Sequence, residues 1–449
     1  MGRLFGTDGI RGLYGGELNS SLAHLVGRAL INALPCKEDR EINVLIGMDT
    51  RLSSDTLADS VAEGICYGGG NATIIGVCST PAVAYLVLKG GYDAGVMISA
   101  SHNPWEYNGI KIFGSDGFKL SDELEEKIEE LILDRDEIPK RAERLGKLDY
   151  VFDAADEYCD YIIGSAGRLD GLKIGIDCAN GSASATAEKI FTSLGAECII
   201  LADKPDGMNI NKDCGSTHIE SLRRLVTEKQ LDAGIAFDGD ADRCLAIDEK
   251  GQDVDGDHII AILAQKLMDE GRLNNNTVVG TVMSNLGLVK FCEGHGIDFK
   301  AAKVGDRYVL EMLNAEGLSL GGEQSGHIIL RELSTTGDGQ LTAAYLLSHM
   351  AKSKKKLSCL ASAMKKFPQH MINVKANAEE KSLLKTDEVI KKLIYECECK
   401  MGSAGRILIR PSGTEPLIRV MTEGESPELA EEICRNLASG IENRLNELK

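Results

Sequence analysis

A serine able to act as a nucleophile occurs in the sequence Ser-Ala-Ser-His-Asn-Pro at residues 99–104, directly after the apolar run Gly95–Ile98. The second serine of this sequence, Ser101, is followed by His102, and Lys111 lies further along the same segment. A serine at the end of a strand beside an imidazole and an ammonium group suits covalent catalysis. Ser-His pairs are also common in ordinary turns, so this motif alone leaves a structural role open.

Three aspartates at alternate positions, Asp238, Asp240 and Asp242, follow the apolar run Gly234–Phe237. Such carboxylates can direct their oxygens to one point, as a hard cation such as Mg²⁺ requires, whereas without a cation they repel one another. An EF-hand loop is excluded because its sixth position needs glycine and Arg243 stands there. An aspartyl-phosphate phosphatase, whose aspartate signature also follows a strand, remains an alternative.

A third polar loop, Gly-Gly-Glu-Gln-Ser-Gly-His at residues 321–327, places a carboxylate, a hydroxyl and an imidazole between glycines. Glycines let the backbone approach a ligand closely. A glutamate close to a serine suits recognition of neighbouring sugar hydroxyls. The candidate residues are Glu323, Ser325 and His327.

A fourth loop, residues 410–419, combines two arginines, two hydroxyl side chains and a glycine. Converging backbone N–H groups and guanidinium forks bind phosphate. The candidate phosphate ligands are Arg410, Ser412, Gly413, Thr414 and Arg419. Arg11 in the Gly-rich turn 6–12, and Lys303 before Val-Gly-Asp, are further basic residues in short polar motifs.

A second acidic cluster, Asp253, Asp255 and Asp257, resembles the first in spacing. Here Gly256 indicates a turn, and an acidic residue beside it suits a helix N-terminus, which the helix macrodipole stabilises. We therefore expect a structural role for this cluster.

Three segments of the chain share one pattern, and they contain the first three loops. Residues 44–104, 173–243 and 278–330 each read as a short buried strand, a loop, a helix and further strands, which is typical of α/β layers. In such sheets ligands bind beyond the carboxyl ends of the strands, where these polar loops fall. We expect three similar domains that contribute one loop each.

After Phe367 the pattern changes, and a helix at Asp387–Cys397 and an amphipathic helix at Pro427–Leu448 predict a small α+β domain. The expected boundaries lie in the charged stretch 134–147, near 251–257 and around the basic run 352–356. The predicted domains are 1–150, 151–253, 254–367 and 368–449.

The composition excludes several classes of protein. The chain has 449 residues, 43% hydrophobic and 27% charged, which is ordinary for a globular protein with real cores. Its net charge of −19 disfavours nucleic acids and anionic membranes as partners. It has neither a membrane-spanning apolar run nor a signal-peptide core, so we expect a cytoplasmic protein. The 13 cysteines form no Cys-x-x-Cys pair, which argues against a zinc or redox motif.

Five motifs occur together in this chain: FGTDGIRG, SASHNP, DGDADR, GGEQSGH and RPSGTEPLIRV. In order and spacing they resemble the α-D-phosphohexomutase superfamily over essentially the whole chain. Within it, the opening GRLFGTDGIRG and the form GEQSGH resemble the branch that acts on amino sugars, whereas mannose and glucose relatives usually read GEMSGH. The resemblance implies three similar mixed-sheet α/β domains and a C-terminal α+β phosphate-binding domain around a central cleft.

The resemblance also implies a mechanism. Ser101 would be phosphorylated, and Asp238, Asp240 and Asp242 would bind one Mg²⁺ together with the phosphoserine. The enzyme would convert glucosamine 6-phosphate to glucosamine 1-phosphate through a sugar bisphosphate that also serves as activator, feeding UDP-N-acetylglucosamine synthesis. General acid–base candidates are His102, Lys111, Arg11 and His327.

The remaining implied roles concern the substrate. Glu323 and Ser325 would bind sugar hydroxyls, and the loop 410–419 the phosphate that is not transferred. Further substrate-binding residues would be Arg243, Lys303 and His327. The resemblance suggests a homodimer, with no nucleic acid or membrane partner. A mutase for glucose or mannose phosphates, a phosphoserine-forming phosphatase and a non-catalytic sugar-phosphate sensor remain as alternatives.

Overall fold

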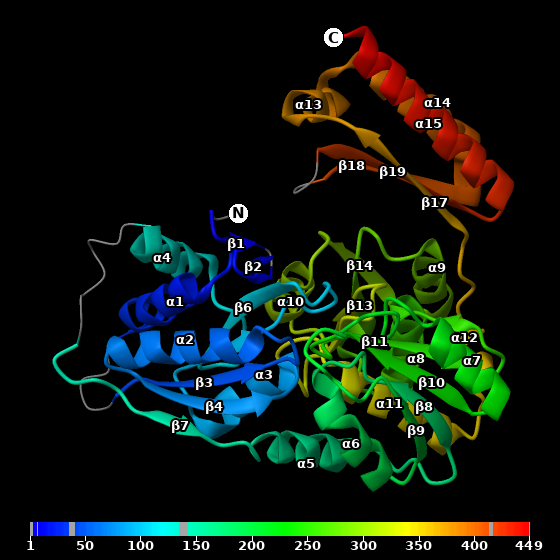
Figure 1. The fold of residues 1–449 in the computed structure, drawn as a ribbon. Coiled ribbons are helices and arrows are strands. Elements are labelled where there is room, and N and C mark those ends of the chain that lie inside the picture. The colour runs from blue at the N-terminus through cyan, green and yellow to red at the C-terminus, as the bar shows by residue number, and fades with distance from the viewer. Residues whose placement is uncertain (1–2, 7, 36–40, 134–141, 413–415, 449) are drawn as a thin grey trace. The chain divides into compact units, whose positions relative to one another are not determined.

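The computed structural model of the chain describes residues 3–448 apart from residue 7 and the ranges 36–40, 134–141 and 413–415. The chain divides into two compact units. The first contains residues 1–283 and 296–363, and the second contains residues 284–295 and 364–449. The elements of both units are labelled in Figure 1.

The N-terminal part of the first unit is built on a seven-stranded sheet of order β1-β2-β6-β5-β3-β4-β7. Strand β3 pairs in parallel with β4 and β5, while β6 runs antiparallel to β5. The strands are β1 (Phe5–Gly6), β2 (Gly9–Leu13), β3 (Asn43–Met48), β4 (Asn71–Val77), β5 (Ala94–Ile98), β6 (Tyr107–Gly114) and β7 (Leu148–Tyr150). The helices are α1 (Ser20–Ala33), α2 (Ser54–Tyr67), α3 (Thr80–Gly90) and α4 (Asp122–Leu133).

Alternation of side chains along the strands assigns the two faces of this sheet. Ile46 and Val96 belong to the core formed with α1, α2 and α4. Gly47, on the opposite face, approaches α3 so closely that a Cβ there would lie 2.5 Å from Val83 Cγ2. Glycine at this position therefore lets α3 pack directly on the strands.

The next part of the first unit has a five-stranded sheet of order β12-β11-β10-β8-β9. Its strands are β8 (Lys173–Asp177), β9 (Glu197–Leu201), β10 (Ala233–Phe237), β11 (Cys244–Asp248) and β12 (Asp253–Val254). Its helices are α5 (Ala155–Ser165), the 3₁₀ turn η1 (Ser182–Ala185), α6 (Ala187–Ser193) and α7 (Glu220–Lys229).

The last part of the first unit has a four-stranded sheet of order β14-β13-β15-β16. Its strands are β13 (Thr277–Thr281), β14 (Asp298–Ala302), β15 (Leu320–Gly322) and β16 (Ile328–Leu330). Its helices are α8 (Gly256–Asp269), the 3₁₀ turn η2 (Asn274–Asn276), α10 (Asp306–Glu316), α11 (Gly339–Ser353) and α12 (Leu357–Ala361). Asp255 caps α8 by accepting from His258 N, so the second acidic cluster does mark a helix start, as the sequence predicts.

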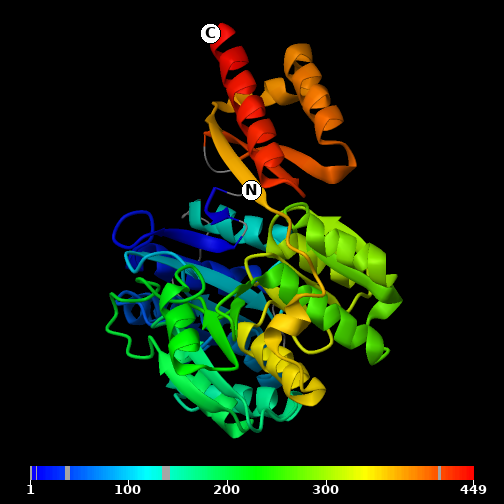
Figure 2. The same cartoon turned by 90° about the vertical axis from the view of Figure 1, so that its right-hand side faces the viewer.

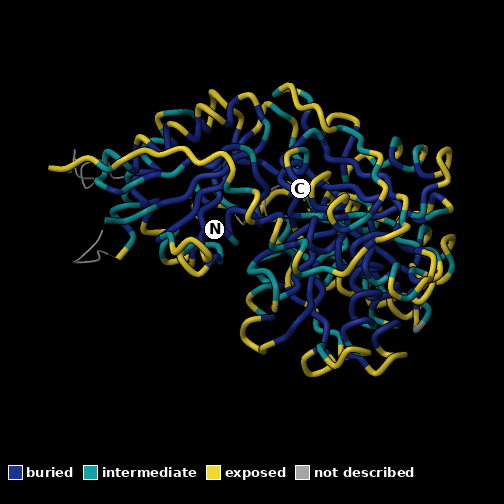
Figure 3. Tube along the Cα trace, turned by 90° about the horizontal axis from the view of Figure 1, so that it is seen from below, coloured by how far each residue is buried: buried dark blue, intermediate teal, exposed yellow. Residues whose placement is uncertain are grey.

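The three sheets share a core of four strands in the same order, which confirms the predicted repeat. In each sheet the first strand of the repeat (β3, β8 or β13) lies between two parallel neighbours, and an antiparallel strand follows the second of them. Strands β5, β10 and β13 are buried at every residue. Figure 3 shows such buried segments in dark blue beside exposed yellow loops. The three polar loops of the sequence lie between the paired strands β5–β6, β10–β11 and β15–β16.

The second unit has a three-stranded antiparallel sheet of order β17-β19-β18, and α15 packs along it (Figure 2). Its strands are β17 (Gln369–Lys375), β18 (Gly405–Pro411) and β19 (Leu417–Gly424). Its helices are α9 (Leu286–His295), α13 (Ala378–Thr386), α14 (Glu388–Met401), the 3₁₀ turn η3 (Gly402–Ala404) and α15 (Pro427–Glu447). Both predicted C-terminal helices are present, with ends shifted by a few residues.

One buried carboxylate fixes the N-terminal segment that leads to Arg11. Glu129 on α4 accepts hydrogen bonds from the backbone N–H groups of Arg3, Leu4 and Phe5 at 2.9, 2.7 and 2.5 Å. Burial raises the pKa of the Glu129 carboxyl, but these three donors outweigh it and hold the pKa below its ordinary value. At pH values above the pKa that Glu129 has in the unfolded chain, the charged carboxylate therefore stabilises the fold. This stabilisation is lost as the pH falls through the lower pKa that Glu129 has in the folded protein.

Replacing Glu129 by glutamine should therefore lower the free energy of unfolding by about 1 to 3 kcal/mol at neutral pH, because the backbone donors lose a charged acceptor. The difference from wild type should shrink as the carboxylate of the wild-type protein becomes protonated in acid. Thermal unfolding at pH 7 and at acid pH measures both effects. Glu130→Gln, at an exposed position of the same helix, is the control. Equal destabilisation by both variants, or a difference that grows in acid, would contradict this explanation.

Candidate active site

Two of the polar loops meet at Ser101 within the first unit. Ser101 Oγ donates a hydrogen bond to Asp238 Oδ2 at 2.5 Å, although the two loops follow strands of different sheets. Each residue lies just beyond the carboxyl end of its strand, β5 or β10. The structure therefore brings together the serine and the first aspartate that the sequence singled out.

The three aspartates form one buried cluster. Asp238, Asp240 and Asp242 each offer an oxygen, and these oxygens lie within 4.8 Å of one another. Burial, together with the charges of Asp242 and Asp240, raises the pKa of Asp238 well above its ordinary value. The Oδ1 atoms of Asp240 and Asp242 accept no hydrogen bond from the described residues. This donor set of crowded, partly unsatisfied carboxylates fits a hard divalent cation.

Lys111 on β6 lies against the aspartate cluster. Its Nζ is 2.7 Å from Asp240 Oδ2, 3.3 Å from Asp242 Oδ2 and 3.2 Å from Asp8 Oδ2. Burial alone lowers the pKa of Lys111, but the three carboxylates raise it well above its ordinary value. Lys111 is therefore a fixed positive charge.

His102 contacts both the serine and an arginine. Its Nδ1 lies 3.4 Å from Ser101 Oγ and 3.3 Å from an Arg243 guanidinium nitrogen. Burial, and then the positive charges of Arg243 and Arg11, lower the pKa of His102 to about 4. His102 is thus neutral at pH 7 and can accept a proton but not donate one as an imidazolium.

His327, from the third loop, lies between two carboxylates. Its Nδ1 is 3.6 Å from Asp242 Oδ2, and its Nε2 is 3.7 Å from Asp306 Oδ2. Burial lowers the pKa of His327, but Asp242 and then Asp306 raise it above its ordinary value. The Gly337 N–H donates to Nε2 at 3.1 Å, so the proton of the neutral ring is on Nδ1, toward Asp242.

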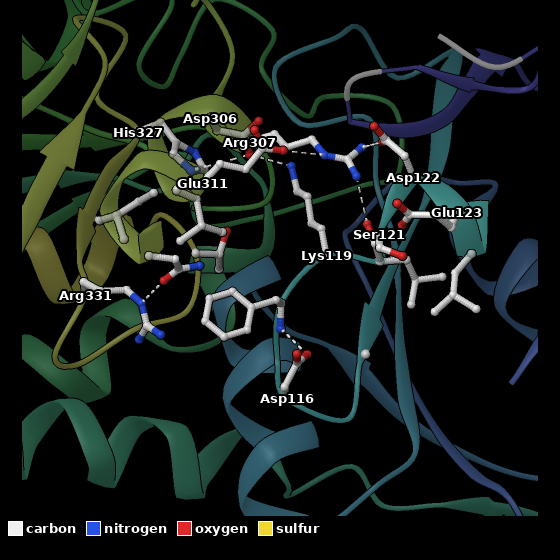
Figure 4. Close-up of a pocket in the computed structure, with 18 residues that line it drawn as sticks. Asp116, Lys119, Ser121, Asp122, Glu123, Asp306, Arg307, Glu311, His327 and Arg331 are labelled. Atoms are coloured by element: carbon white, nitrogen blue, oxygen red, sulfur yellow. Dashed lines mark hydrogen bonds and ion pairs between the residues drawn. The ribbon is translucent and has the colours of Figure 1, made fainter. Parts of the chain in front are cut away.

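Sequence reasoning missed Lys119, which connects these groups. Its Nζ lies 2.5 Å from Asp8 Oδ1 and 2.5 Å from Asp306 Oδ2, and Figure 4 shows it reaching toward Asp306 with His327 nearby. A closed ring of alternating charges results, which we call the charged ring: Lys111, Asp8, Lys119, Asp306, His327 and Asp242. Nothing in the spacing of Lys119 indicates this position, because its partners come from distant segments.

A cavity of about 670 Å³ borders the charged ring. One wall is lined by Gly114, Asp116 and residues 118–124, and the other by residues between 306 and 336. Lys119, Asp306 and His327 are among them (Figure 4). Arg307, whose side chain lies at this cavity, pairs with Glu125 of α4 at 3.2 Å.

The other predicted residues of the first unit lie around this centre. Arg11 pairs with Asp8. Glu323 accepts a hydrogen bond from Gly305 N at 3.1 Å. Ser325 and Lys303 are exposed, and the Lys303 ammonium lies over the ring of Tyr308.

The predicted phosphate loop belongs to the second unit. Arg410 and Arg419 are register partners across β18 and β19. Burial, and then the charge of Arg419, lower the pKa of Arg410, a pairing of like charges that an anion would stabilise. Ser412 is buried, and its carbonyl accepts from Lys381 Nζ at 2.7 Å. Gly413 and Thr414 lie outside the described residues.

Two further findings concern the whole chain. No helix in the described ranges is long and apolar enough to cross a membrane. All twelve cysteines of the described part are free.

Models of one protein family match nearly the whole chain. The three alpha/beta/alpha domains of the phosphoglucomutase/phosphomannomutase family match residues 2–139, 156–251 and 255–367, and its C-terminal domain matches residues 371–439. The phosphoglucosamine mutase of Caldicellulosiruptor saccharolyticus is 50% identical over 451 residues, covering 99% of this chain and 100% of that protein. The phosphoglucosamine mutase of Acetivibrio thermocellus is also 50% identical, with the same coverage.

Solved structures share the fold. A phosphoglucomutase/phosphomannomutase family protein from Burkholderia thailandensis superposes with a TM-score of 0.82 at 23% identity, covering 98% of this chain and 97% of that one. Aspergillus fumigatus N-acetylphosphoglucosamine mutase, in complex with GlcNAc-6P and magnesium, superposes with a TM-score of 0.66 at 15% identity, covering 98% and 95%.

Proposed function

The chain belongs to the phosphoglucomutase/phosphomannomutase family, and we propose that it is an isomerase that interconverts glucosamine 6-phosphate and glucosamine 1-phosphate. The amino sugar is favoured by the two relatives that share half of its residues over their full length, both phosphoglucosamine mutases. The observation that carries the chemistry is the contact between Ser101 Oγ and the buried aspartate cluster. A phosphoryl group on Ser101 would sit beside carboxylates that can hold a cation.

Asp238, Asp240, Asp242 and the phosphorylated Ser101 would hold one Mg²⁺. When bound, the ion would neutralise negative charge on the transferring phosphoryl group. The unsatisfied oxygens of Asp240 and Asp242 support this assignment.

In the first half-reaction, the bond between phosphorus and Ser101 Oγ breaks as a bond to O1 of the 6-phosphosugar forms. The O1 proton passes to a base, and Ser101 Oγ takes up a proton and becomes a hydroxyl again. Lys111 lies against Asp240 and Asp242, and Arg243 contacts His102, the neighbour of Ser101. As cations close to the aspartate cluster, they suit stabilisation of the transferring group. Lys111 is held protonated, so it is suited to stabilise negative charge and not to remove a proton. Among the remaining candidates, neutral His102 contacts Ser101 Oγ, with its Nδ1 at 3.4 Å.

In the second half-reaction, the sugar bisphosphate rotates by a half-turn, and the bond between phosphorus and O6 breaks as a bond to Ser101 Oγ forms. Ser101 Oγ gives up its proton and O6 gains one, so no phosphate is consumed. Glu323 and Ser325 would bind the sugar hydroxyls, with Lys303 and His327 nearby. The phosphate that is not transferred would bind to Arg410, Ser412, Gly413, Thr414 and Arg419. A sugar bisphosphate would first load Ser101, so we expect activity to depend on such an activator.

We also propose that the domains are residues 1–150, 151–253, 254–367 and 368–449. The support is that each range contains one of the four polar loops and one sheet, except that the boundary at residue 253 falls within the edge strand β12.

The test of this function is a comparison of initial rates on glucosamine 6-phosphate, mannose 6-phosphate and glucose 6-phosphate, with Mg²⁺ and a bisphosphate activator. We expect kcat/KM for glucosamine 6-phosphate to exceed the other two by at least about tenfold. A preference for mannose or glucose would overturn the substrate while retaining the chemistry. Steady release of inorganic phosphate would instead support the phosphatase alternative.

Gly256, the first residue of α8, allows a test of the third loop. A Cβ at this position would lie 2.1 Å from Glu323 O and 2.8 Å from Gly326 N. Gly256→Ala should therefore displace the loop and raise KM for the sugar phosphate about tenfold. Steady-state kinetics measures this change. Gly164→Ala on α5 is the matched control because a Cβ there meets no atom within 4 Å. An unchanged KM in Gly256→Ala would argue against a substrate-binding role for this loop.

A further inference from the structure

We propose that Arg51 and Asn211 are positioning residues for Ser101. They donate hydrogen bonds to backbone carbonyls of residues 99–107, which we call the serine loop, and so fix the direction of the serine Oγ. This inference rests on the proposed function, because it concerns the nucleophile of that reaction. Neither residue contacts the Ser101 side chain, so each would act only through the backbone.

Arg51 is buried and uses all five of its N–H groups. Its Nε donates to Asp49 Oδ2 at 2.8 Å. One terminal nitrogen donates to Ser101 O at 2.8 Å and to Asn103 O at 2.9 Å. The other donates to Tyr107 O at 3.0 Å and also to Pro104 O. Four of the five bonds thus end on the serine loop.

Asn211 reaches the same loop from the segment between β9 and α7. Its Nδ2 donates to Ser101 O at 2.8 Å and to Asn103 O at 3.1 Å. Gly239, next to the first aspartate, closes the remaining side, since a Cβ there would lie only 2.4 Å from Ser101 O. The Ser101 carbonyl is therefore held by two side-chain donors and bounded by the backbone of the aspartate loop.

The backbone N–H of Ser101 also has a hydrogen-bond partner. Ser101 N donates to Ser99 Oγ at 2.9 Å, and Ser99 Oγ donates to Asp49 Oδ2 at 2.7 Å. Asp49 therefore anchors both Ser99 and Arg51.

These contacts explain a strained backbone conformation. Ser101 has a φ of 52°, in the left-handed region that residues other than glycine rarely adopt. Such a conformation persists only where the surroundings enforce it. It places Oγ 2.5 Å from Asp238 Oδ2, and without the contacts to its backbone the serine would relax away from this position.

Asn211→Gly provides a clean test. Asn211 itself has a φ of 58°, so glycine removes the two donors without adding backbone strain. The matched control is Asn275→Gly, because Asn275 has a φ of 54° but is exposed and lies in η2, outside the proposed site. Arg51→Lys is the second variant, which keeps the positive charge beside Asp49 but loses the planar fork.

The first readout requires no substrate. Trp105, the single tryptophan of the chain, lies within the serine loop and lines a cavity of about 550 Å³ together with Asn211. If the contacts order the loop, acrylamide quenching of Trp105 fluorescence should increase by about twofold in Asn211→Gly and in Arg51→Lys, but not in Asn275→Gly.

The second readout is single-turnover transfer of phosphate from Ser101, after the protein is loaded with glucose 1,6-bisphosphate and mixed with glucosamine 6-phosphate. We expect the transfer rate to fall about 10- to 100-fold in both variants while KM changes by less than about twofold. Intact-protein mass spectrometry gives the loaded fraction, and melting temperatures show whether each variant is folded.

Two results would overturn the inference. In the first, folded variants transfer phosphate at the wild-type rate with unchanged quenching. In the second, only the melting temperature falls, which would mean that the contacts serve stability alone. If wild-type protein never carries phosphate on Ser101, the proposed function fails instead, and the quenching comparison still tests whether the contacts order the loop.

Discussion

Ser101→Ala should abolish mutase activity, with a fall in kcat of about 10⁴-fold or more, because no other described side chain occupies the position of the nucleophile. The alanine variant should fold normally, since it loses the hydroxyl contact to Asp238 but keeps the contacts of Arg51 and Asn211 to the loop backbone. Coupled assays in both directions, with intact mass measured before and after incubation with a sugar bisphosphate, check this result. The variant should show neither turnover nor a gain of phosphate.

Ser382→Ala is the control for this experiment, because Ser382 is an exposed serine on α13 of the second unit. It should retain both activity and phosphorylation. Mutase turnover near the wild-type rate in Ser101→Ala would refute the covalent mechanism.

Asp240→Asn should reduce kcat by about 10³-fold, because it removes one charge from the cluster that would hold the cation. Asp240 also accepts hydrogen bonds from Thr80 Oγ1 at 2.5 Å and from Lys111 Nζ at 2.7 Å, so the change affects both the cation site and the fixed ammonium. Titration calorimetry with Mg²⁺ should show weaker binding by the variant. Removal of divalent cations with a chelator should abolish the mutase activity of the wild type, and added Mg²⁺ should restore that activity.

Asp253→Asn is the matched control, since Asp253 belongs to the second acidic cluster and pairs with Arg223 at the surface. It should bind Mg²⁺ and turn over as the wild type does. The cation assignment would be wrong if Asp240→Asn kept wild-type affinity for Mg²⁺ and wild-type turnover.

The sequence was informative where chemistry is local. Ser101 and the three aspartates stand in short motifs after buried strands, and the repeat places these motifs at strand ends, where the structure has them. Even the weakest copy, which contains β13, has the same strand order as the others. Continuous apolar runs and loop composition are sufficient for this part of the fold.

The sequence did not predict the residues whose roles depend on contacts between distant segments. Lys119 and Asp306 carry no signal of their own, because their pairing depends on how two parts of the first unit pack. The role of Arg51 could not be predicted from the sequence for another reason. Its partners are backbone carbonyls, which every residue has, so no residue type marks them. The low pKa of His102 likewise depends on burial and on the charges of Arg243 and Arg11, which only the folded chain brings together.

The most direct test of the account follows a labelled phosphate from Ser101. Protein carrying ³²P on Ser101 is mixed with excess glucosamine 6-phosphate and stopped at times within one turnover. The account predicts that label leaves the protein at the rate of product formation and appears in sugar bisphosphate and then in sugar monophosphate. Label that stays on the protein while product forms at the full rate, or that leaves as inorganic phosphate, would contradict it.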